Sequence, residues 1–101
     1  HVERQDRLLS RAALLVKPGG RLIYVTCSVL RDENEYRVAA FLAGNPEFRS
    51  IPVAEVWREA LGTQCPSNAV SGDFLFLTPQ RHGTDGFFVA VLVEKSDINA
   101  P

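Results

Sequence analysis

The stretch YVTCSVLRDENE at residues 24–35 contains the side chain of this chain best suited to covalent chemistry. Cys27 is the last residue of the apolar segment RLIYVTC and precedes a polar, acidic one. A cysteine reacts as its thiolate, and the partial positive charge at the start of a helix stabilises that anion. Cysteine is also among the most often buried residue types, where it acts as a small hydrophobic side chain. From its position alone, Cys27 is therefore either a nucleophile or a core residue.

The polar neighbours of Cys27 have simple structural interpretations. The hydroxyl of Ser28, which follows a strand, most often satisfies nearby backbone groups. Asp32 can cap a helix, and Glu35 three residues later completes an Asp-x-x-Glu variant of the capping box. We expect Asp32, Glu33 and Glu35 to form a solvated helix start that does not contact a substrate directly.

The second candidate is HGTDGFF at residues 82–88. Its glycines permit tight backbone angles, Asp85 can hydrogen-bond within its own loop, and Phe87 opens a strand. By itself this pattern is typical of a loop that enters a sheet. If the loop returns toward Cys27, it forms a wall of a pocket for a nucleobase.

The pattern of apolar residues and breakers predicts a short series of elements. A helix over about residues 2–16 is stopped by PGG, and a strand follows at 21–27, apolar without alternation, as in strands covered on both faces. A second helix begins at Asp32 and ends at Gly44 to Pro46. Residues 47–72 are the least readable, with an extended EFRSIPV, a short helix in AEVWREAL and a loop. DFLFLT and GFFVAVLVEK then form an antiparallel pair of strands.

This order fits half of a doubly wound α/β sheet whose last strand returns antiparallel to the others. Ligands of such sheets gather beyond the carboxyl ends of the parallel strands. Thr26, Cys27 and Ser28 lie at such an end.

Composition and charge exclude several classes of function. The 101 residues, 46% hydrophobic and 23% charged, suit one soluble domain, and a formal charge of -1 provides no overall field that would hold a polyanion. No apolar run approaches the roughly 20 residues of a membrane span, and the polar N-terminus does not resemble a signal peptide. We therefore expect a cytoplasmic protein with no membrane association.

Metal and nucleotide motifs are missing from the sequence. Two cysteines and the lone histidines His1 and His82 give no zinc-binding spacing, and His82 is expected on the surface. The sequence does not decide whether Cys27 and Cys65 form a disulfide. KPGG precedes a strand, so its glycines form a turn and not a phosphate-binding loop.

Two motifs carry a family resemblance. LVKPGGRLIYVTCSVLRDENE resembles the late conserved region of the Fmu/RsmB/Sun family of S-adenosylmethionine-dependent RNA cytosine-5 methyltransferases, and HGTDGFFVAVLVEK resembles its C-terminal signature. KPGG is generic to class I methyltransferases, whereas Thr-Cys-Ser followed by Glu-Asn-Glu, and Asp-Gly-Phe-Phe, are more specific. The resemblance implies an α/β fold: the C-terminal portion of a Rossmann-like class I methyltransferase sheet, with its seventh strand inserted antiparallel between the fifth and sixth.

The resemblance also implies a mechanism and a set of site residues. Cys27 matches the catalytic cysteine, whose thiolate adds to carbon 6 of a flipped-out cytosine so that carbon 5 can accept a methyl group. Substrate binding is assigned to Thr26, Ser28, Asp85, Gly86 and Phe87. The substrate is RNA, with ribosomal RNA expected. Residues 1–95 form a C-terminal fragment of the catalytic domain, and residues 96–101 a disordered tail.

Parts of the family's machinery are expected upstream of this chain. They include the residues that bind S-adenosylmethionine and an Asp-Ala-Pro-Cys motif, for which Cys65 is no substitute, so Cys65 is assigned a structural role. The isolated chain is therefore expected to be inactive. Without its upstream neighbour, the strand at 21–27 exposes an apolar edge that invites self-association.

Two other functions remain open. The chain can be a non-enzymatic RNA-binding or interaction module that kept the methyltransferase fold, although its near-neutral charge disfavours RNA binding without help. A methyltransferase for small molecules or proteins fits the generic KPGG turn. It leaves the spacing from Thr-Cys-Ser to Glu-Asn-Glu unexplained.

Overall fold

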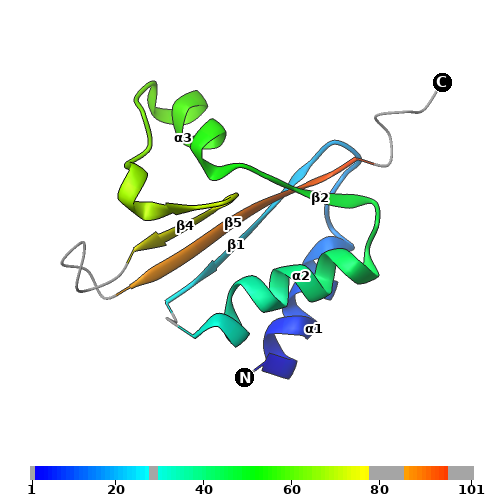
Figure 1. Ribbon diagram of the computed structural model, residues 1–101. Helices are drawn as coiled ribbons and strands as arrows, with labels where there is room; N and C mark the ends of the chain where they lie inside the picture. Colours follow the sequence, from blue (N-terminus) through cyan, green and yellow to red (C-terminus); the bar gives the residue numbers. More distant parts are fainter. Residues whose placement is uncertain (1, 28–29, 78–85, 96–101) are drawn as a thin grey trace.

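The computed structural model describes residues 2–27, 30–77 and 86–95. Figure 1 shows a sheet with helices packed against it. The elements are α1 (Val2–Ala13), β1 (Arg21–Thr26), the 3-10 helix η1 (Arg31–Glu33), α2 (Glu35–Gly44), β2 (Phe48–Ile51), α3 (Val53–Leu61), the 3-10 helix η2 (Ser67–Ala69), β3 (Val70–Ser71), β4 (Phe74–Leu77) and β5 (Phe87–Glu94). The sequence predictions for Ser28, His82, Asp85 and the tail 96–101 lie outside the described residues.

β5 is the central strand of a five-stranded sheet with the order β1-β5-β4-β3. It pairs antiparallel with β1 over its length, and also antiparallel with β2 and β4. β1 and β4 therefore run in the same direction on either side of it. The predicted insertion of a last, antiparallel strand between two earlier strands is confirmed.

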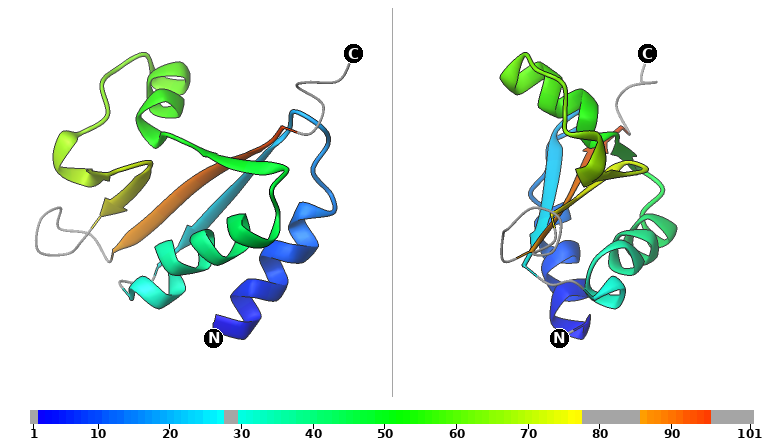
Figure 2. Two further views of the ribbon diagram at one scale, coloured as in Figure 1. Left: turned by 45° about the vertical axis from the view of Figure 1, so that its right-hand side comes forward. Right: turned by 60° about the vertical axis from the view of Figure 1, so that its left-hand side comes forward.

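The two faces of β5 bury different residues, because neighbouring side chains of a strand point to opposite sides. Phe88, Ala90 and Leu92 pack into a cluster with residues of α1 and α2, including Leu9 and Val38. Val91 and Val93 pack with β2 and α3 on the other face. Figure 2 shows α1 and α2 together and α3 away from them. Burial on both faces explains why GFFVAVLVEK is apolar without alternation.

β1 does not have the burial that its sequence predicts. Tyr24 is buried, but the side chains of Ile23 and Val25 are 57% and 53% exposed. β1 stands at the end of the strand order, where β5 is its neighbour. The prediction of a strand covered on both faces is therefore wrong for the described residues, because no described element covers Ile23 and Val25 fully.

Both predicted helix boundaries need correction. α1 ends at Ala13, and Leu14, Leu15 and Val16 continue in turns whose amides bond to carbonyls three residues back. α2 begins at Glu35, with Asn34 as its N-cap and η1 before it. Asp32 is thus not the cap. The sequence rule failed because a 3-10 turn at 31–33 delays the helix by three residues.

The unreadable segment at residues 47–72 contains more structure than a loop. β2 confirms the extended stretch, and α3 confirms the short helix. The stretch expected to be loop also contains η2 and the two-residue β3. Across the ranges that the structure covers, no helix is both long and apolar enough to span a bilayer.

Phe88 provides a test of the core, because it is 0% exposed and its ring contacts those of Tyr24, Phe74 and Phe76. The Phe88→Ala substitution should lower the free energy of unfolding by about 3–5 kcal/mol, measured by urea denaturation. Phe87→Ala is the matched control on the same strand, since Phe87 is 37% exposed. Its effect should be about 1 kcal/mol or less. Equal losses for the two variants would contradict this packing.

Candidate active site

Cys27 lies immediately after the carboxyl end of β1, and its side chain is exposed and free. The register pairs Thr26 with Phe88, so the end of β1 lies beside the start of β5. Gly86 and Phe87 are therefore at the same end of the sheet as Cys27. The sequence alternative of a thiol sealed in the core does not hold.

A groove of about 590 Å³ lies beside the Cys27 thiol. It is shallow and largely open to solvent. The groove is lined by Arg4, Gln5 and Leu8 of α1, Tyr24, Val25 and Thr26 of β1, Cys27 itself, and Glu33 of η1. Gly86 and Phe87 are not among these lining residues. Their substrate-binding role stays a prediction.

The contribution of α1 to this groove was missed by the sequence analysis. Arg4 lies on the exposed surface of the helix, and the side-chain carbonyl oxygen of Gln5 is buried with no hydrogen-bond partner in the described part of the chain. Arg4 and Gln5 precede Cys27 by more than twenty positions, and no local motif links them to it. Only the packing of α1 beside β1 brings them together.

Thr26 does not have a free hydroxyl. Its Oγ1 donates a hydrogen bond to Oδ1 of Asn34, a residue that is entirely buried. The predicted role of Thr26 in substrate binding stays a prediction. The structure shows that the hydroxyl is engaged with the protein itself.

Tyr24, which also lines the groove, connects β1 to η1. Its hydroxyl donates a 2.6 Å hydrogen bond to the carbonyl oxygen of Glu33. Burial raises the pKa of Tyr24 to about 12, the carboxylates of Glu33 and Asp6 act in the same direction, and Arg37 opposes them. Tyr24 is therefore a neutral hydrogen-bond donor at physiological pH.

Cys65 has the opposite environment to Cys27. It is 6% exposed and packs with Val53, Ala69 and Leu75 beneath α3. Burial raises the pKa of the Cys65 thiol. Both cysteines are free, so the disulfide that the sequence left open is not formed. These facts agree with a structural role for Cys65.

A metal site is not apparent in the portion of the chain that the structure covers. There, no group of three or more His, Cys, Asp or Glu side chains is arranged to hold a metal ion.

Comparison with solved structures defines the class of protein. The crystal structure of PH0851 aligns over 90% of this chain with a TM-score of 0.73 and 38% sequence identity, and the chain covers 18% of it. A structure described as a methyltransferase homolog protein from Pyrococcus horikoshii aligns over 92% of the chain with a TM-score of 0.67 and 28% identity, and 30% of it is covered. The fold is that of a Rossmann-like methyltransferase.

Sequence comparison then identifies the family. The model of the 16S rRNA methyltransferase RsmB/F family matches residues 1–93, and the chain belongs to this family. A probable ribosomal RNA small subunit methyltransferase B of Synechocystis is 39% identical over 87% of this chain. The chain spans 19% of the length of that relative.

The two cysteines should differ sharply in reactivity because only Cys27 is open to solvent. With an aromatic disulfide reagent, we expect Cys27 to be labelled quickly in the native chain and Cys65 only after denaturation. The fast phase should disappear in Cys27→Ala and persist in Cys65→Ala, as monitored by absorbance and by mass spectrometry of peptides. Fast native labelling of Cys65 would contradict the packing beneath α3.

Proposed function

We propose that this chain carries the catalytic cysteine of an enzyme that transfers a methyl group from S-adenosylmethionine to carbon 5 of cytosine in RNA, with small-subunit ribosomal RNA as the substrate. The observation that carries the proposal is the exposed Cys27 thiol at the end of β1, beside the groove between β1, α1 and η1. Membership of the RsmB/F family supports the class of reaction. An enzyme that methylates small-subunit ribosomal RNA would act in the cytoplasm.

A nucleophilic cysteine answers a specific chemical difficulty. Carbon 5 of an unactivated cytosine is a poor nucleophile and does not attack a methyl group by itself. Addition of the Cys27 thiolate to carbon 6 moves the electrons of the 5,6 double bond toward carbon 5. After methylation, loss of the carbon 5 proton restores the double bond and expels the thiolate. S-adenosylmethionine supplies the methyl group when bound.

The role of this chain is to present the nucleophile to a base that has left its stack. The groove beside Cys27 is open to solvent on one side and bounded by α1 and η1, so an extruded pyrimidine can approach the sulfur. Beside Cys27, we retain Ser28, Asp85, Gly86 and Phe87 as substrate-binding candidates, whereas the Thr26 hydroxyl is engaged by Asn34.

The cofactor would be held mainly by other residues of a longer protein. In this sequence the KPGG turn precedes β1, and a phosphate or cofactor cradle requires glycines after a strand. We therefore propose that the chain alone is inactive and that its activity belongs to the full-length parent.

A covalent trap tests the role of Cys27. Fluorine at carbon 5 cannot leave as a proton does, so the enzyme stays attached to the base after methyl transfer. The full-length parent with S-adenosylmethionine and a small-subunit ribosomal RNA transcript containing 5-fluorocytosine should form an adduct that survives denaturing electrophoresis. Cys27→Ala should abolish the adduct, and the Cys65→Ala control should retain it.

Two results would count against the proposal. An adduct that persists in Cys27→Ala would remove this cysteine from the mechanism. RNA binding by the parent with no methyl transfer and no adduct would favour the alternative of a non-enzymatic RNA-binding module.

We further propose that the isolated chain self-associates through β1. This strand ends the strand order, has no proline, carries one charged residue, Arg21, and exposes Ile23 and Val25. An uncovered strand edge of this kind can pair with a second copy.

Sedimentation velocity should show concentration-dependent association of the isolated chain. Ile23→Lys should reduce the association, because a lysine on an edge strand opposes pairing. Leu61→Lys is the matched control, since Leu61 is 60% exposed and lies on α3 and not on β1. A monomer at all concentrations would contradict this part of the proposal.

A further inference from the structure

A hydrogen bond joins the residue just before Cys27 to the residue just before α2. Thr26, immediately before Cys27, donates from Oγ1 to the Oδ1 atom of Asn34, immediately before α2. The contact spans 8 positions in sequence. Cys27 therefore lies between two residues whose side chains are bonded to each other.

Asn34 is suited to this task by its complete burial. It is 0% exposed, and it is the buried polar residue of the described core. A buried amide oxygen without a partner loses its hydrogen bonds to water, so Asn34 favours the conformation in which Thr26 reaches it. Asn34 is also the N-cap of α2, but its side chain makes no capping hydrogen bond. The contact with Thr26 uses the side-chain oxygen instead.

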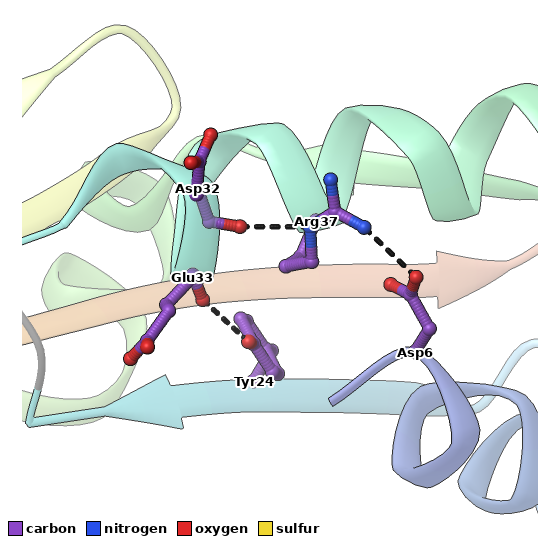
Figure 3. A network of polar contacts seen from close by, with 5 residues as sticks. All are labelled: Asp6, Tyr24, Asp32, Glu33 and Arg37. Carbon is purple, nitrogen blue, oxygen red and sulfur yellow. Dashed lines mark hydrogen bonds and ion pairs between the residues drawn. The ribbon is translucent and has the colours of Figure 1, made fainter. Parts of the chain in front are cut away.

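Two further contacts hold η1, within the same loop, in place. Figure 3 shows Tyr24 reaching the carbonyl oxygen of Glu33, and Arg37 of α2 reaching the carbonyl oxygen of Asp32. Arg37 also bonds Asp6 of α1 at 2.8 Å. Tyr24 and Thr26 are two positions apart on β1, so both project from the same face of the strand toward the loop. η1 is thus fastened to β1 and α2, and α2 is in turn joined to α1.

We propose that Thr26 and Asn34 are positioning residues for the Cys27 nucleophile. The inference rests on the proposed function and assigns Thr26 a role other than contact with the substrate. Its single hydroxyl proton is used toward Asn34, so it is not available for a base. Because a displacement of about 1 Å at a reacting atom can cost roughly 100-fold in rate, a tether at the residue next to the sulfur has a direct effect on chemistry.

Substitutions at Thr26 separate the hydroxyl from the shape of the side chain. In the full-length parent, Thr26→Val removes the hydroxyl at nearly constant volume, and Thr26→Ser keeps it. Thr26→Val should slow adduct formation with 5-fluorocytosine ribosomal RNA by about 10- to 100-fold in single-turnover experiments. The dissociation constant for that RNA should not change. Thr26→Ser should retain a rate close to that of the unaltered protein.

Substitutions at Asn34 test the partner. Asn34→Asp keeps an acceptor for the Thr26 hydroxyl and should retain most of the rate, whereas Asn34→Leu removes it. The Thr26→Val and Asn34→Leu double variant should be no slower than the slower single variant, because the two residues act through one contact. If Asn34→Leu does not fold, the comparison of Thr26→Val with Thr26→Ser tests the inference by itself.

Amide hydrogen exchange of residues 27–34 gives a second readout that does not require activity. Exchange should rise in Thr26→Val and stay low in Thr26→Ser. Two results would overturn the inference: an unchanged adduct rate in Thr26→Val, whether or not RNA binding weakens, or equal slowing in Thr26→Val and Thr26→Ser. If the unaltered parent forms no adduct, the proposed function fails. Unchanged amide exchange of residues 27–34 in Thr26→Val would separately refute the role of the Thr26–Asn34 contact.

Discussion

The burial of β5 on both faces and both edges is the constraint on which the rest of the structure depends. Phe88, Ala90 and Leu92 are each 0% exposed toward α1 and α2, and the opposite face packs on β2 and α3. Antiparallel pairing with β1 then places the carboxyl end of β1 beside the start of β5. The position of the Cys27 thiol is therefore a consequence of the core, although the thiol itself is exposed.

The two cysteines show how environment assigns different roles to one residue type. Cys65 lies among apolar side chains, where burial raises the pKa of its thiol and excludes reagents. Cys27 lies exposed at a strand end, beside the groove lined by residues of α1, β1 and η1. The polar contacts next to Cys27, from Thr26 to Asn34 and from Tyr24 to Glu33, join β1 to the segment that precedes α2.

The failed sequence predictions share one physical cause, because each treated a local pattern as complete. The apolar run at 21–27 predicted coverage on both faces, yet Ile23 and Val25 are exposed because no described element lies fully over them. Asp32 fits a capping box, but a tight turn at Arg31–Glu33 and the contact of Asn34 with Thr26 place the start of α2 later. The apolar stripe of the first helix predicted an end near residue 16, whereas the α-helix continues only to Ala13 and turns follow, although Val16 still packs on the core.

The sequence by itself determined the fold class, the antiparallel last strand and the cysteine at the end of a strand. These follow from apolar periodicity, turn residues and short motifs, all of which act over a few neighbouring positions. The tertiary structure alone decided that the Cys27 thiol is exposed, that Arg4, Gln5 and Leu8 line its groove, and that Asn34 fastens the loop after it. These depend on contacts between residues distant in sequence, and side-chain burial is settled only when the elements pack together.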